Sequence, residues 1–169
     1  MSSAHIHALR PMPLRRERRH ETATEAARYL GAVSVLLVGV VHAQQYYDAY
    51  FSVVPTIGTL FLLSFVGAGA VGAVLFAPMR RLGRAGEAIL ALAALGGIGI
   101  ALGTLVSLLV SEYTPLFGFM ESGYRLAIVL TLLFDGLTTV FLGMFLAIVG
   151  PQLVRALQAL DAQHQAPRP

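Results

Sequence analysis

The chain of 169 residues contains no cysteine, no tryptophan and no lysine, and charged residues make up only 12% of it. Without cysteine there can be no disulfide, thiolate nucleophile, iron–sulfur cluster or cysteine-ligated zinc. Soluble domains carry about 25% charged residues, and a water-soluble fold of this size could not bury a composition that is 56% hydrophobic. The composition excludes a soluble enzyme, a disordered chain and a disulfide-rich secreted domain, and it predicts an integral membrane protein.

Four long apolar segments are present, at about residues 23–46, 55–77, 87–110 and 125–149. Each is long enough to cross the hydrocarbon layer, which takes about 20 helical residues. Thr22 and Glu25 have the spacing of a capping box, which predicts the start of the first helix, and Gly150-Pro151 predicts the end of the last. Because the connections are short, we expect an all-α membrane protein, an up-down bundle of four transmembrane helices.

The ends of the chain differ from this transmembrane domain, which we place at residues 22–151. Residues 1–21 are polar and rich in arginine, and we expect a disordered cytoplasmic tail there. Residues 152–169 are expected to form a cytoplasmic C-terminal tail. An alternative for the start of the chain is a signal peptide that ends near Val41-His42-Ala43, after an arginine-rich segment and an apolar run at 29–41. The sequence leaves this cleavage open.

Arginine is distributed unevenly among the connections. Among the arginines close to the spans, a four-span arrangement puts only Arg125 on one side of the membrane. The other side has nine, namely Arg15, Arg16, Arg18, Arg19, Arg28, Arg80, Arg81, Arg84 and Arg155. The side richer in basic residues is normally cytoplasmic. We therefore expect a multi-pass protein of a bacterial inner membrane with both termini in the cytoplasm. The cluster formed by Arg15, Arg16, Arg18 and Arg19 is also expected to attract anionic lipid.

Asp135 lies near the middle of the last apolar segment. An ionised carboxylate at that depth costs about 2.5–3.5 kcal/mol on insertion scales, so such residues usually face the interior of a bundle or a wet cavity. Thr131, Asp135, Thr139, Gly143 and Ala147 recur every four residues and form a small or polar stripe on this helix. The sequence allows two interpretations, a proton or cation site, or a protonated carboxyl hydrogen-bonded to Thr131 or to a neighbouring helix.

The first segment and the expected outer loops contain other polar candidates. His42 lies about one turn inside the outer end of the first helix, where it could relay protons to Asp135 or be solvated by lipid headgroups. The loops gather an outer rim of tyrosines and carboxylates, namely Tyr46, Tyr47, Asp48, Glu112 and Glu121. Tyrosine is common at membrane interfaces, and the carboxylates could bind a divalent cation. No ligand spacing singles out a metal site, and a single imidazole does not predict haem, so we expect no cofactor.

Rows of small residues at four-residue spacing predict close helix packing. They are Ser64, Ala68 and Gly72 in the second segment, Gly99, Gly103 and Ser107 in the third, and Gly143 in the fourth. Packing within the monomer is the favoured interpretation, and self-association is the alternative. We find no phosphate-binding loop, nucleophile elbow or metalloprotease motif, and no sign of nucleic-acid binding.

Two short segments resemble a known group of proteins. Pro55-Thr56-Ile57-Gly58-Thr59-Leu60-Phe61-Leu62-Leu63 and Leu116-Phe117-Gly118-Phe119-Met120-Glu121 resemble segments of uncharacterised four-helix membrane proteins of actinobacteria, over about residues 30–149. The resemblance implies four spans and an acidic residue in the last span, where this chain has Asp135. It implies no activity. The Gln44-Gln45 pair departs from that pattern and makes the outer loop more hydrophilic.

Three functions are compatible with these features. The favoured hypothesis is a non-enzymatic accessory or structural component of the cell envelope that acts through an oligomer or a membrane partner. The first alternative is a proton-coupled carrier or channel-like protein that uses Asp135, Thr131, Thr139 and His42. The second is a lipid- or metal-binding protein that uses the outer rim.

Overall fold

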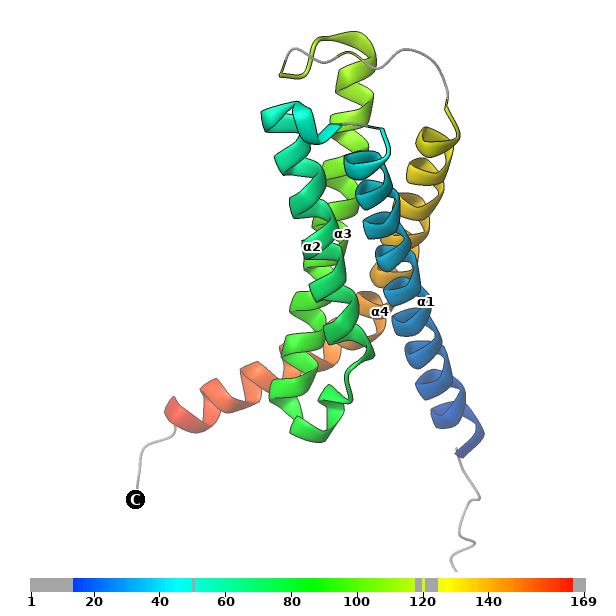
Figure 1. Cartoon of the computed structure of the whole chain (residues 1–169). Coiled ribbons are helices and arrows are strands. Elements are labelled where there is room, and N and C mark those ends of the chain that lie inside the picture. The colour runs from blue at the N-terminus through cyan, green and yellow to red at the C-terminus, as the bar shows by residue number, and fades with distance from the viewer. Residues whose placement is uncertain (1–13, 50, 118–119, 121–124, 166–169) are drawn as a thin grey trace, which may run out of the picture.

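The computed structural model describes residues 14–49, 51–117, 120 and 125–165. Within these ranges the chain forms four long helices, α1 (Leu14–Tyr47), α2 (Pro55–Phe76), α3 (Arg84–Tyr113) and α4 (Leu126–Gln165). Two short 3₁₀ helices, η1 (Phe51–Val53) and η2 (Met79–Leu82), lie in the first two connections. Consecutive helices pack side by side, and α4 returns to pack against α1 (Figure 1). The predicted all-α, up-down bundle of four helices is confirmed.

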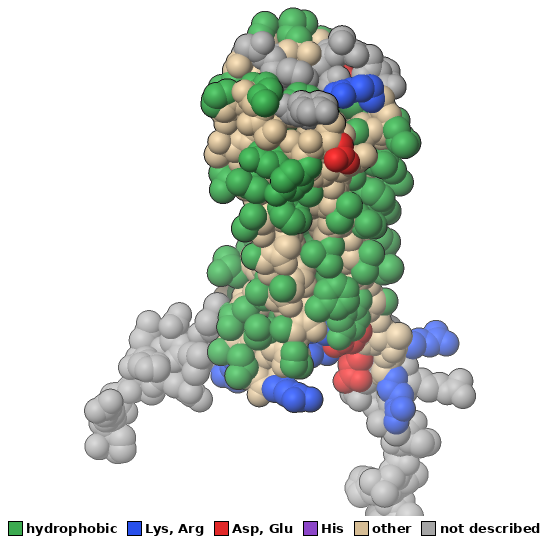
Figure 2. Space-filling view, viewed as in Figure 1, with side chains coloured by type: hydrophobic (Ala, Val, Ile, Leu, Met, Phe, Trp, Pro, Cys, Tyr) green, Lys and Arg blue, Asp and Glu red, His purple; other side chains and the backbone are tan. Residues whose placement is uncertain are grey.

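The surface of the bundle is that of a multi-pass membrane protein. All four helices in the described part of the chain are long and apolar enough to cross a membrane. In the most apolar stretch of each of α2, α3 and α4, only 17–28% is buried inside the protein. Most of the hydrophobic side chains of these helices therefore face outward. Figure 2 shows hydrophobic side chains over the middle of one face, with arginines gathered near the lower end. Such an outward-facing hydrophobic surface fits the hydrocarbon interior of a membrane, where no water contacts it.

We call the end of the bundle where α1 begins the inner end, and the opposite end the outer end. The start of α1 and the last turns of α4 lie near the inner end, as does η2 (Figure 1). The described arginines follow the predicted asymmetry, because η2 carries Arg80 and Arg81, whereas Arg125 lies before the first turn of α4 at the outer end.

Helix α1 begins earlier than the sequence predicted. Residues 14–21, expected to be disordered, are helical, whereas residues 1–13 lie outside the described ranges. Thr22 does not cap a helix, because its hydroxyl donates to the carbonyl oxygen of Arg18 at 2.8 Å, inside the continuing helix. Arginine and glutamate are good helix formers, and the segment before Thr22 consists mostly of them.

Helix α4 also passes the stop that Gly150-Pro151 predicted. The helix continues to Gln165 with Pro151 inside it, so the predicted end at residue 149 is wrong. Proline removes one backbone hydrogen bond and its ring clashes with the preceding turn, which kinks a helix without necessarily ending it. Figure 1 shows the C-terminal part of α4 turning away from the bundle at a steep angle.

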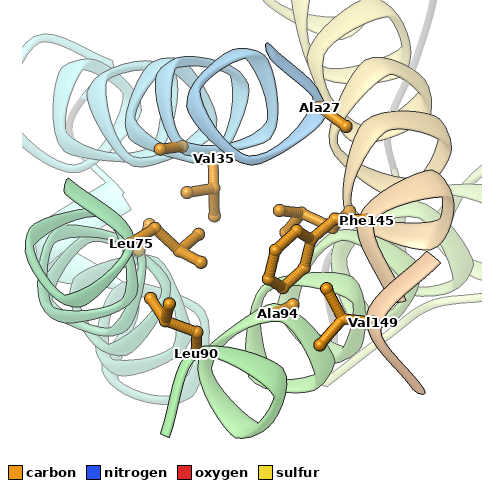
Figure 3. Close-up of a cluster of buried hydrophobic side chains, with 10 residues drawn as sticks. Ala27, Val35, Leu75, Leu90, Ala94, Phe145 and Val149 are labelled. Atoms are coloured by element: carbon orange, nitrogen blue, oxygen red, sulfur yellow. The ribbon is translucent and has the colours of Figure 1, made fainter. Parts of the chain in front are cut away.

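The core lies between all four helices in the inner half of the bundle. Figure 3 shows Val35 of α1, Leu75 of α2, Leu90 of α3, and Phe145 and Val149 of α4 pointing toward one another. These side chains are buried or nearly so, and alanines complete the cluster. Together these aliphatic and aromatic side chains form an apolar layer between the helices.

Candidate functional site

Asp135 is completely buried, at 0% exposure, on the face of α4 that contacts α3. The hydroxyl of Thr104 in α3 donates to Asp135 Oδ2 at 2.7 Å. The second carboxyl oxygen, Oδ1, has no hydrogen-bond partner, and neither has the buried hydroxyl of Thr138, one turn further along α4. Buried polar groups are normally paired, so this cluster of Asp135, Thr104 and Thr138 is unusual.

The predicted four-residue stripe on α4 is only partly inside the bundle. Thr131, Thr139 and Gly143 are half-buried and Ala147 is exposed, whereas Asp135 alone is fully buried. Each four-residue step overshoots a helical turn by about 40°, so the stripe winds out of the interface. The buried face instead repeats every seven residues, with Ile128, Asp135, Leu142 and Val149 in one row and Thr138 and Phe145 in another.

The two predicted threonines therefore do not hold the carboxyl side chain. The hydroxyl of Thr139 donates to the backbone carbonyl oxygen of Asp135 at 2.9 Å, which is an ordinary bond inside a helix. The side-chain partner is Thr104 on the neighbouring helix. The hypothesis of a hydrogen bond to another helix is thus confirmed, whereas the carboxyl has no such bond to Thr131.

A groove of about 320 Å³ runs beside this cluster between α2 and α3. We call it the outer groove, because its lining continues to Leu116 in the segment after α3, at the outer end. Most of its walls are apolar side chains and the two glycines Gly99 and Gly103, and its polar groups are His42, Ser64, Thr104, Ser107 and Ser111. Thr104 belongs to both sites, so one hydroxyl connects the buried carboxyl with the groove.

His42 lies in the wall of the outer groove and is 5% exposed. Its Nδ1 is 2.8 Å from the carbonyl oxygen of Val38. Since a carbonyl oxygen only accepts, Nδ1 carries a proton, and in the neutral ring Nε2 is the acceptor. The ring also packs against Phe61, with 5.2 Å between centroids. The structure thus brings His42 and Thr104 to the same groove, but the hydrogen bonds do not join His42 to Asp135.

The small-residue rows pack differently on each helix. In α2, Ala68 and Gly72 are buried, and a Cβ at Gly72 would meet the Leu36 side chain at 2.5 Å, so this row packs against α1 as expected. In α3, a Cβ at Gly99 or Gly103 would meet no atom within 4 Å. The prediction that this pair packs within the monomer is therefore wrong. It is also wrong for Gly143, where a Cβ would likewise meet no atom within 4 Å.

The glycine that α3 uses for packing is Gly97. A Cβ there would lie 2.6 Å from Leu142 Cδ1, and one at Gly31 of α1 would lie 2.3 Å from Leu142 Cδ2. Leu142 thus sits between two glycines on two helices. Gly97 lies in a four-residue row of small residues with Ala93 and Ala101, which the sequence analysis did not single out.

The described residues of the outer rim do not come together as a metal centre. Among the described residues no three His, Asp or Glu side chains are close enough to share an ion. Asp48 is exposed, Glu112 is half-buried, and Tyr46 and Tyr47 contact each other edge to face, with 4.9 Å between their centroids. Glu121 lies outside the described residues.

At the inner end, Arg28 is buried, whereas the sequence indicates only its role in setting the topology. Its Nη2 donates to Glu25 Oε2 at 2.8 Å and to the hydroxyl of Tyr29. Arg80 of η2 pairs with the other oxygen of Glu25, also at 2.8 Å. Glu25 therefore ties α1 to the connection between α2 and α3.

Of the predicted lipid-binding arginines, Arg18 and Arg19 are exposed, whereas the side chains of Arg15 and Arg16 lie outside the described part.

Sequence inspection missed Thr104, Thr138, Ser111 and Arg28. A hydroxyl row was nevertheless visible in the third segment, since Thr104, Ser107 and Ser111 share one helix face. The seven-residue repeat through Asp135 would likewise have placed Thr138 inside. No known family model, curated protein or solved structure matches the chain, so its function has to be inferred from its own residues.

Proposed function

We propose that the protein is a non-catalytic accessory or structural component of a bacterial inner membrane and that it works as an oligomer. The observation that carries the proposal is the open row of Gly99 and Gly103 on α3, both of them exposed. The proposed contact is between this row and the same row of a second copy.

Small residues matter in a membrane because lipid provides no hydrophobic drive for helices to associate. Association depends on close van der Waals packing and on hydrogen bonds between helices, both of which glycine and serine favour. A glycine row that faces lipid contributes little to the monomer, while it leaves a flat strip of backbone on which another helix can lie. A two-fold contact brings the same strip from both chains together.

The proposed contact leaves the floor of the outer groove free. Gly103 is exposed at its edge, whereas Thr104 and Ser111 are less exposed and lie about 100° further round the helix axis. A second helix on the glycine row would cover the side of the groove that faces lipid. It would not occupy the space next to Thr104 and Ser111.

The orientation we propose has both termini in the cytoplasm. It is supported by the arginines of η2, by the exposed Arg18 and Arg19, and by the position of the inner end of α4. Arg15, Arg16, Arg18 and Arg19 would face the anionic leaflet, where each basic residue is worth about 1 kcal/mol of membrane attraction.

Cross-linking tests the association directly, because the chain has no cysteine of its own. Gly99→Cys should form a disulfide-linked dimer in oxidised membranes, whereas Leu102→Cys, which is exposed about 60° away on α3, should do so much less. Adding Gly103→Leu to the Gly99→Cys chain should abolish the dimer, since the new side chain has free space in the monomer but blocks a second helix. Gly103→Ala should preserve it. Equal cross-linking at positions 99 and 102, or a dimer that survives Gly103→Leu, would contradict the proposal.

A further inference from the structure

The hydrogen-bond geometry around Thr104 is incomplete when Asp135 is ionised. Thr104 Oγ1 lies 2.7 Å from Asp135 Oδ2 and 3.0 Å from the carbonyl oxygens of both Ile100 and Ala101. A carboxylate and two carbonyls are all acceptors, whereas the hydroxyl has a single hydrogen. If the carboxyl carries a proton on Oδ2, it donates to Thr104, and Thr104 donates to a backbone carbonyl. One added proton therefore completes the chain of bonds.

The described helices around Asp135 carry no cation beside it that would balance an ionised carboxylate. The helices packed against α4 are α1 and α3. Between Glu87 and Glu112, α3 has no titratable side chain, and the part of α1 between Tyr29 and Tyr46 has only His42. Helix α2 has none from Pro55 to Phe76. His42 is bonded to Val38 rather than to the carboxyl, so neutralisation by a proton is the remaining way to reduce the cost of burying this charge.

A polar path leads from Asp135 toward the outer end of the bundle. Thr104, Ser107 and Ser111 all line the outer groove, and they span seven residues, or about 10 Å along the helix axis. The groove volume of about 320 Å³ is large enough to admit water, since one molecule occupies roughly 30 Å³ in the liquid. These hydroxyls can hydrogen-bond such waters, and His42 lines the same space.

The opposite direction is closed by the apolar layer. From Asp135 toward the inner end, the next interior residues of α4 after Thr138 are Leu142, Phe145 and Val149. Figure 3 shows Phe145 and Val149 facing Leu75 and Leu90 in the middle of the bundle. A second cavity, lined by Glu21, Arg80 and Glu87 among others, lies on the inner side of this layer. Leu90, Phe145 and Val149 of the layer form part of its wall.

From these observations we propose that Asp135 is a proton-binding site that opens only toward the outer end of the bundle. A proton from water in the outer groove is added to a carboxyl oxygen of the ionised Asp135, which gives a neutral acid bonded to Thr104. Release reverses the same path. The site extends beyond the proposed oligomeric role and does not depend on it, because all of its residues come from one chain.

Water access is tested by cysteine labelling in cells or oriented vesicles. Ser107→Cys should react with a charged, membrane-impermeant thiol reagent added at the outer side. Leu109→Cys is the matched control, since it is exposed on the lipid side of the same helix at nearly the same depth. The expected result is rapid labelling at position 107 and little at 109. Equal labelling at both positions, or none at 107, would overturn the outward path.

Proton binding is tested by infrared spectroscopy of the full chain in sealed vesicles of one orientation. The wild type should show the C=O stretch of a protonated carboxyl that Asp135→Asn removes and that disappears as the pH of the outer side is raised. Thr104→Val keeps the carboxyl but removes its partner, so it should shift this band, whereas Thr104→Ser should restore the wild-type position. The Thr104 pair keeps the test valid if Asp135→Asn does not fold.

Three results would overturn the proposal that Asp135 is a proton-binding site. They are the absence of a protonated carboxyl band in the wild type, a band that is the same in Thr104→Val and the wild type, and a band that does not respond to pH at the outer side. A failure of the cross-linking experiment would leave these measurements unaffected, so the two proposals can fail separately.

Discussion

The contact of Leu142 with two glycines gives a quantitative prediction. A Cβ at Gly97 would lie 2.6 Å from Leu142 Cδ1 and 3.2 Å from Val71 Cγ1, and both are shorter than ordinary contacts. Because Leu142 is also held by Gly31 and is fully buried, it cannot move freely. Overpacking of this kind costs about 1–3 kcal/mol, so we expect Gly97→Ala to destabilise the fold by that amount. Gly99→Ala, with open space around its Cβ, should cost close to nothing.

A double-mutant cycle tests the reasoning further. Leu142→Ala alone should lower the free energy of unfolding by an amount near the lower end of about 2–5 kcal/mol, the range known for water-soluble cores. The cost is smaller in a membrane because a leucine side chain gains little free energy on moving from lipid into the protein. In the double variant, the alanine methyl at position 97 occupies part of the space that Leu142 leaves. The combined loss should therefore be smaller than the sum by about 1 kcal/mol or more.

The assay is reversible unfolding in mixed micelles, followed by far-ultraviolet circular dichroism. Additive losses in the double variant would show that Gly97 and Leu142 do not share the contact. Equal losses for Gly97→Ala and Gly99→Ala would refute the distinction between a packed and an open glycine on α3.

Three further predictions concern the inner end. Glu25→Gln leaves the buried Arg28 without an anionic partner, so it should lower the free energy of unfolding by about 3 kcal/mol. This is the lower end of the range for breaking a buried pair, and we choose it because Glu25 is 31% exposed. Arg80→Gln, which removes only the more exposed arm of the same network, should cost about 1 kcal/mol or less in the same unfolding assay. Pro151→Ala restores a backbone hydrogen bond inside α4, so the distance between spin labels on either side of residue 151 should increase as the helix straightens. An unchanged distance would mean that packing rather than proline bends the helix.

Hydropathy and charge were sufficient to predict the main architecture. Four apolar segments gave four helices, because in lipid each backbone polar group must be bonded within its own helix. The predicted bounds of α2 agree with the structure to within one residue at each end. The wrong predictions concern the start of α1 and the end of α4. Thr22 predicted a helix start and Pro151 a helix end, but both residues lie inside a helix. Nothing in the local pattern distinguishes the two situations.

The sequence by itself placed Asp135 inside the bundle, since a charge in the middle of an apolar helix has few alternatives. Only the tertiary structure decided that its partner is Thr104, 31 residues away on α3, rather than Thr131 or Thr139 on its own helix. Only the structure likewise showed that Gly97 is packed while Gly99 and Gly103 are open. The physical reason is the same in both cases. Composition along one helix shows which residues can face inward, but the rotation of each helix about its axis is set by the side chains of its neighbours.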